Sequence, residues 1–142
     1  GATHMIKIKA NVIGIKDPIE VKRTIYRKNL ANSMLRKLLK IDIDTANAEE
    51  AEKTDEEISD EEAAKQAIKD IDADEKDIDE IFDFLKEALS LSNAQIKKAR
   101  KEVDEEELGG FVYYVVARLR GASEEDFNFE SKAEAKIDPK KE

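Results

Sequence analysis

The stretch Asp104–Gly121, DEEELGGFVYYVVARLRG, decides the fold. Apolar side chains recur along it at steps of three and four residues, which is the period of one face of an α-helix: Leu108, Phe111, Val112, Val115 and Leu119. A helix turns by about 100° per residue, which places Gly110, Tyr113, Tyr114 and Ala117 on its other faces. These other faces are therefore not strongly polar either. A helix that is apolar nearly all round is enclosed by its neighbours or covered by a partner. We therefore expect this helix at the centre of the molecule.

Both ends of this helix carry recognisable signals. Asp104 and Glu107 have the spacing of a capping box, in which each side chain accepts a hydrogen bond from the other residue's backbone. Arg118 and Arg120 suit the negative C-terminal pole, and Gly121 is a suitable residue for a left-handed C′ position. The sequence thus predicts where this helix begins and ends.

Composition excludes several classes of protein. Residues 1–4 are interpreted as an expression-tag remnant, with Met5 as the native start, so His4 carries no function. The absence of cysteine excludes disulfides and thiolate chemistry, and without another histidine the usual zinc sites are excluded too. The sequence shows neither an apolar run of membrane-spanning length nor a signal peptide. We expect a soluble intracellular protein that has no cofactor and no membrane partner.

Charge is unevenly distributed along the chain. The formal net charge is −9, yet residues 7–40 carry ten basic and two acidic side chains. Such a chain can attract a charged partner or another copy of itself. Solvated faces that simply differ in sign are an equally good interpretation.

The rest of the chain predicts a mainly α protein. Ile6, Ile8 and Ala10 alternate with lysines, which is typical of a half-buried strand, and a second alternating run follows Pro18. Asn29 is the expected N-cap of the next helix. The expected architecture is a small helical bundle with an N-terminal β-hairpin and an acidic flexible loop. Its predicted parts are a single domain over 5–127, made of a hairpin (5–26), a helix (29–41), an acidic linker (42–59) and a helical bundle (60–121), followed by a charged, disordered tail (128–142).

Within the predicted bundle, further capping signals divide the helices. Ser59 with Glu62 predicts the start of one helix, and the apolar pattern restarts in phase after Asp74 and ends near Ser90. Ser92 then predicts the start of a short helix that precedes the central one.

The sequence contains no complete metal-binding or catalytic motif. Asp70, Asp72 and Asp74 match positions 1, 3 and 5 of an EF-hand loop, but Glu75 replaces the required glycine and Ile81 the closing glutamate. The sequence has no glycine-rich phosphate loop, nucleophile elbow or histidine base, and its carboxylates lie on faces expected to be solvated. We expect neither a metal site nor an enzyme.

A partner-binding surface is the remaining kind of site. Tyr113 and Tyr114 flank the small residues Gly110 and Ala117, a combination that can accept another helix because tyrosine is frequent at interface centres. The alternative is that both tyrosines belong to the core. The candidate partner-binding residues are Gly110, Tyr113, Tyr114, Ala117, Phe127 and Phe129.

A second, weaker candidate surface is basic. Lys22, Arg23, Arg27 and Lys28 surround Tyr26 and could contact phosphates. The acidic chain repels a polyanion at longer range, so lysines that keep a strand edge soluble are the favoured interpretation.

Taken in order, three segments resemble the tail assembly chaperones of long-tailed bacteriophages, particularly phages of Gram-positive hosts. The segments are MIKIK (Met5–Lys9), IDEIFDFLKEALSLSNAQIKKA (Ile78–Ala99) and GGFVYYVVARLRGASEEDF (Gly109–Phe127). The resemblance implies a non-enzymatic adaptor that binds the tape measure protein, and other tail proteins besides, and keeps the tape measure soluble until the tail polymerises. It implies the cytoplasm of the bacterial host and absence from the mature virion, and it leaves homo-oligomers open. A small regulator that binds nucleic acid through the basic first forty residues is the alternative function.

Overall fold

The computed structural model describes residues 5–52 and 58–127. These residues form a two-stranded sheet, a short 3-10 helix and α-helices, which confirms the mainly α class with an N-terminal hairpin. The elements are β1 (Met5–Ile8), η1 (Asn11–Ile13), β2 (Ile19–Lys22), α1 (Ile25–Glu52), α2 (Asp60–Leu89), α3 (Asn93–Glu102) and α4 (Glu105–Leu119).

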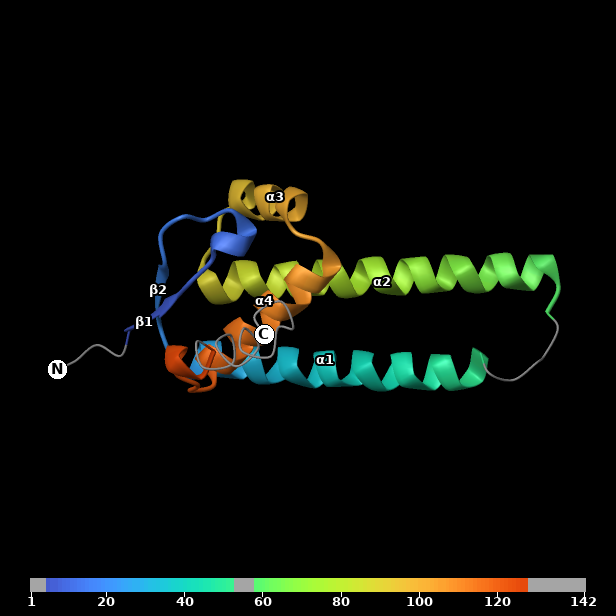
Figure 1. Cartoon of the computed structure of the whole chain (residues 1–142), viewed down its shortest axis with the longest axis horizontal. Coiled ribbons are helices and arrows are strands. Elements are labelled where there is room, and N and C mark those ends of the chain that lie inside the picture. Colours follow the sequence, from blue (N-terminus) through green and yellow to red (C-terminus); the bar gives the residue numbers. More distant parts are fainter. Residues whose placement is uncertain (1–4, 53–57, 128–142) are drawn as a thin grey trace, which may run out of the picture.

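The two long helices, α1 and α2, run antiparallel. Tyr26 near the start of α1 bonds to Glu87 near the end of α2, and Lys37 pairs with Asp77 further along. As Figure 1 shows, the hairpin, α3 and α4 gather at one end of this pair, while the other half of each long helix projects beyond them. We call the packed end the head and the projecting halves, residues 42–52 and 60–76, the arm.

The hydrophobic core lies in the head around α4. Phe111, Val115 and Leu119 are buried, as predicted, and so is Leu108. They pack in one cluster with buried side chains from every other element of the head, among them Ile8, Ile13, Val21, Met34, Leu38, Leu85, Leu89 and Ala99. The central position of α4 follows from its composition, because a helix that is apolar on several faces has to be covered on several faces.

The hairpin is held against α3. β1 and β2 pair antiparallel with Ile6 opposite Val21, and the chain between them passes through η1. Gly14 ends η1 with φ of 82°, a left-handed conformation that favours glycine. A Cβ at Gly14 would lie 2.9 Å from Cε of Lys98 on α3, so the missing side chain also permits this close approach.

Helix α1 differs from its predicted limits at the N-terminal end. It begins at Ile25 and not after Asn29, because Thr24 caps it: the Thr24 Oγ1 accepts a hydrogen bond from the Arg27 N–H at 3.1 Å. The predicted second strand is correspondingly shorter and ends at Lys22.

The predicted acidic linker is wrong over residues 42–52, which continue α1 as helix. Propagating an existing helix adds one hydrogen bond for each residue fixed and requires no new nucleus. Ala46, Ala48, Glu49 and Glu50 are also good helix formers, so the acidic composition alone does not end the helix. The part of the predicted linker at 53–57 and the predicted tail at 128–142 lie outside the described residues.

Helix α2 is continuous where the sequence predicted an interruption near Asp72 and Asp74. Its predicted ends are confirmed: the Ser59 side chain accepts from the Glu62 N–H, and Ser90 adopts a left-handed φ of 54° after the last turn. The capping box of Ser92 with Gln95 on α3 is present as well.

The caps of α4 are also as predicted. Asp104 and Glu107 form the reciprocal capping box. Gly121 has φ of 116°, and the N–H of Ala122 donates to the carbonyl of Ala117, which is the pattern of a Schellman motif.

Candidate functional site

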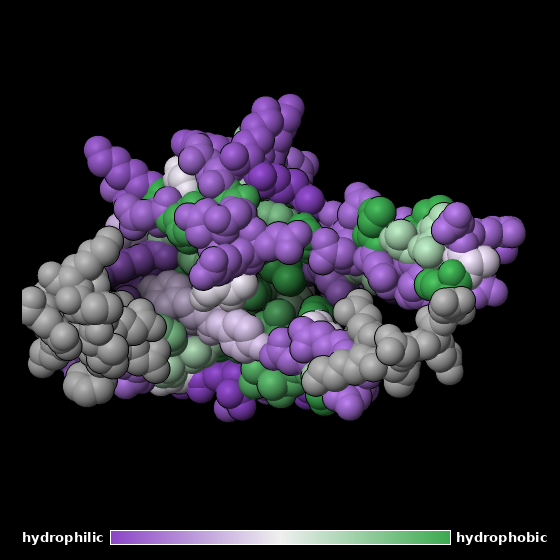
Figure 2. Space-filling view, turned by 45° about the vertical axis from the view of Figure 1, so that its right-hand side comes forward, coloured by the Kyte–Doolittle hydropathy of each residue, from purple (hydrophilic) through white to green (hydrophobic). Residues whose placement is uncertain are grey.

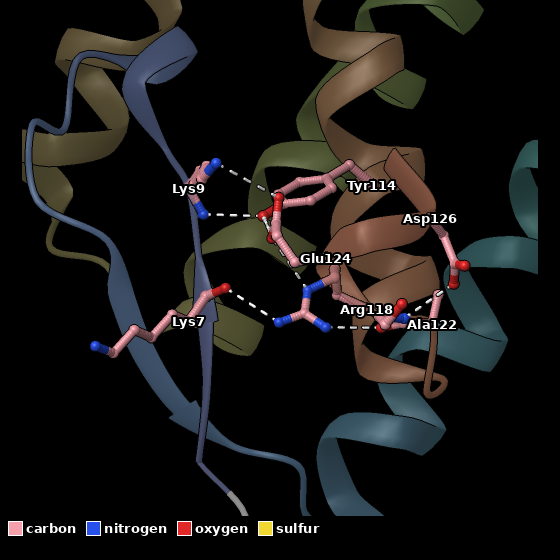
Figure 3. A network of polar contacts seen from close by, with 8 residues as sticks. Lys7, Lys9, Tyr114, Arg118, Ala122, Glu124 and Asp126 are labelled. Atoms are coloured by element: carbon pink, nitrogen blue, oxygen red, sulfur yellow. Dashed lines mark hydrogen bonds and ion pairs between the residues drawn. The ribbon is translucent and has the colours of Figure 1, made fainter. Parts of the chain in front are cut away.

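Tyr114 connects α4 to the hairpin and to the segment that follows α4. Its hydroxyl accepts a hydrogen bond from the backbone N–H of Lys9 at 3.0 Å and donates to the Glu124 carboxylate at 2.6 Å (Figure 3). The Phe127 ring meets the Tyr114 ring edge-on, with 4.9 Å between ring centroids. One side chain therefore holds three segments together.

Arg118, one turn further along α4, completes this connection. Its side chain is buried in the head, with 9% of the residue exposed, and its Nη1 donates to the Ala122 carbonyl at 2.7 Å. Its Nη2 donates to the Lys7 carbonyl at 3.2 Å, and its Nε lies 3.4 Å from Glu124 (Figure 3). The charge is thus compensated by two carbonyls and a carboxylate, as a buried cation requires. We call Tyr114, Arg118 and Glu124 the bracket.

An open hollow of about 400 Å³ lies beside the bracket. Three of the candidate partner-binding residues, Gly110, Tyr114 and Phe127, line it together. No neighbouring atom lies within 4 Å of the position that a Cβ on Gly110 would take, so the surface there is open. The remaining lining residues are Lys9, Asn11, Val12, Glu107, Phe111 and Glu124.

The other candidates are not part of this hollow. Tyr113 is 39% exposed, and its hydroxyl donates to Asp42 on α1 at 3.1 Å. Ala117 is half-buried, and Phe129 lies outside the described residues. The predicted surface is therefore divided, with Tyr113 directed to α1 and Tyr114 to the hairpin.

Both tyrosines are held in the neutral form. Burial raises the pKa of Tyr114 above its ordinary 10.0, and the hydrogen bond to Glu124 acts in the same direction. Burial likewise raises the pKa of Tyr113, followed by its hydrogen bond to Asp42. At neutral pH each hydroxyl is a hydrogen-bond donor to a carboxylate, and neither is prepared to act as a base or nucleophile.

The sequence did not reveal the bracket. Arg118 was interpreted only as a charge favourable to the helix end, although a cation within the apolar run VVARL could have indicated a buried polar contact. Lys7 and Lys9 contribute backbone atoms, and no residue type signals such a role.

In the basic region, the side chains of Arg27 and Tyr26 make internal hydrogen bonds. The Arg27 guanidinium donates to the carbonyls of Ala88 and Lys22 and to the Ser90 hydroxyl. Tyr26 donates to Glu87, which raises the pKa of Tyr26. Arg27 thus satisfies the Ala88 carbonyl at the end of α2 and the Lys22 carbonyl at the end of β2, a structural role that accounts for its presence without nucleic acid.

Within residues 5–52 and 58–127, no group of three or more acidic, histidine or cysteine side chains is arranged to hold a metal ion. None of the helices described there is both long and apolar enough to cross a membrane.

Comparison with known proteins identifies the family. Residues 6–136 match the family of phage tail assembly chaperone proteins, TAC. Since this match covers nearly the whole chain, the protein belongs to that family. Membership gives it a role in phage tail assembly, implies interaction with tail proteins and suggests a non-enzymatic protein. No curated protein and no solved structure shows a significant match.

Proposed function

We propose that the protein is the tail assembly chaperone that binds the tape measure protein of its phage and keeps it soluble until the tail polymerises. The observation that carries this proposal is the presence of exposed apolar side chains on a strongly acidic chain. Ile68 and Ile71 on α2 and Tyr113 on α4 are all exposed in a protein of net charge −9. Exposed apolar groups provide contact for apolar helices, while the net charge keeps a complex in solution.

The proposal includes a location and a host. The chaperone acts in the cytoplasm of a bacterial cell, which the resemblance suggests is Gram-positive, and it is absent from the mature virion. Gly110, Tyr113, Tyr114, Ala117, Phe127 and Phe129 remain a predicted docking surface for the partner, and contacts with other tail proteins or with further copies of the chain are part of the same proposal.

Co-expression tests this function. Overlapping fragments of the tape measure protein encoded by the same phage are produced with and without the chain, and the soluble fraction of each fragment is measured. We expect at least one fragment to move from the insoluble to the soluble fraction and to co-purify with the chain. A full set of fragments that stays insoluble in the presence of the chain would contradict the proposal.

A further inference from the structure

The apolar stripe of α2 continues beyond the head. Ile78 and Leu85 belong to the stripe in the head, and Ala64, Ile68 and Ile71 continue it into the arm at steps of three, four and seven residues. Such steps place all five side chains on one side of the helix. We call Ala64, Ile68 and Ile71 the arm face.

The cover over this stripe ends with the head. Ile78 and Phe82 lie beneath the junction of α3 and α4, where Val103 and Leu108 help to line a hollow of about 150 Å³. Beyond Ile78 no described element covers the stripe, and Ile68 and Ile71 are 58% and 56% exposed. Figure 2 shows apolar residues on the projecting part of α2 among hydrophilic ones.

Acidic side chains border the arm face on both sides. Helical geometry places Glu61 and Asp72 along one side and Asp60 and Asp74 along the other. Residues 42–52 and 60–76 together contain twelve acidic and three basic residues, so their net charge of −9 equals that of the whole chain. Within the described residues, Asp72 and Asp74 make no ion pair.

We propose that the arm face is a docking site for an amphipathic helix of the tape measure protein, with its apolar stripe on Ile68 and Ile71 and lysine or arginine on its flanks. This inference rests on the function proposed above and adds the surface and the chemistry of the bound segment. Charge complementarity selects this occupant, because two copies of the same acidic face repel each other. The part of α2 from Asp60 to Lys76 is about 25 Å long, which matches a partner helix of about 17 residues.

The decisive experiment compares two matched double variants of the full chain. Ile68→Ser with Ile71→Ser removes the arm face. Leu39→Ser with Ile43→Ser is the control, because these residues of α1 are similarly exposed, at 50% and 60%, and lie outside the arm face. The probe is a synthetic peptide that spans an amphipathic helix of the tape measure fragment that the chain keeps soluble, and affinity is measured by fluorescence anisotropy. We expect about a tenfold or greater loss of affinity for the first variant and no more than about a twofold change for the control, with unchanged melting temperatures for both.

Synthetic peptides test the charge requirement separately. One helical peptide carries leucines along one face and lysines beside them, and a second replaces every lysine by glutamate. We expect the wild-type chain to bind the lysine peptide alone, with an affinity that falls as salt is raised.

Several outcomes would overturn the inference. Equal binding of the two peptides would remove the charge argument. Unchanged fragment affinity in the Ile68/Ile71 variant would place docking elsewhere. If that variant also showed a lower molar mass than wild type in light scattering, the arm face would be assigned to contact with a second copy of the chain. Each of these outcomes leaves fragment solubilisation by the wild-type chain intact, so it is distinguishable from failure of the proposed function.

Discussion

The head and the arm contain two halves of the same helix in opposite environments. In the head, α2 buries Ile81, Phe82, Leu85 and Leu89 against the hairpin, α1, α3 and α4. In the arm, every described side chain of α1 from Asp42 onward and of α2 up to Lys76 is exposed. An amphipathic pattern therefore shows which side of a helix will be covered, but it does not tell whether the cover comes from the same chain or from a partner.

The head and the arm should differ most in how much a truncated side chain lowers the free energy of unfolding. Leu119→Ala should lower the free energy of unfolding by about 2–5 kcal/mol, because Leu119 is fully buried and its loss leaves a cavity. Ile71→Ala in the arm should change it by less than about 0.5 kcal/mol. Urea denaturation of both variants measures the contrast. Equal losses would show that the arm is packed in solution.

Substitution of a bracket residue should give the next largest loss of stability. Replacing Arg118 by Met leaves the carbonyls of Lys7 and Ala122 without their donor and should cost about 1–3 kcal/mol. Arg120→Met is the control, since the exposed Arg120 side chain bonds only to Asn32 among the described residues, and its loss should cost little. Thermal melts compare the two variants. A stable Arg118 variant would show that the hairpin edge does not need this cation.

Alkaline pH tests the hydrogen bonds of the Tyr114 hydroxyl without replacing any side chain of the bracket. The pKa of Tyr114 is higher in the folded protein than in the unfolded chain, mainly through burial. Its stabilising contribution is therefore complete below the unfolded pKa of 10.0 and is lost as pH rises through the folded pKa. We expect the melting temperature to fall as pH rises above about 10.

Tyr114→Phe serves as the reference for this measurement. This variant should show a smaller decrease with pH than wild type, although it is less stable at neutral pH because it lacks both hydrogen bonds. Tyr26 and Tyr113 titrate in both proteins, so their effect cancels in the comparison. Parallel pH profiles would contradict the bracket role of the Tyr114 hydroxyl.

The smallest effect on stability is expected from shortening the arm. Among the residues whose burial the structure describes, replacing 46–71 by a short Gly/Ser loop removes only exposed side chains, and loop length changes stability slowly. The free energy of unfolding should change by less than about 1 kcal/mol, while capture of the tape measure fragment is lost. Denaturation of the purified variant measures the first effect and co-expression the second.

Local signals in the sequence predicted the head well. The capping box at Asp104 and the glycine at 121 were found because their partners lie within a few residues. The core positions of α4 followed from its period. The extension of α1 was missed because an acidic composition was interpreted as a linker, although helix propagation depends on the preceding turns.

The bracket could not be predicted in this way. Arg118 meets the Lys7 carbonyl across 111 residues of sequence, and backbone acceptors leave no trace in residue types. The same limit applies to the hollow beside it, which needs η1 and β1 to be placed against α4.

The contacts of Arg118 and Tyr114 with β1 have a consequence for aggregation. A strand at the edge of a sheet presents unpaired N–H and C=O groups, to which a strand from another chain can add. The Lys7 carbonyl and the Lys9 N–H lie two residues apart and point to the same edge of β1, and side chains of α4 already occupy both. The hairpin therefore has no free edge at these positions, and a strand of another chain cannot add to the sheet there.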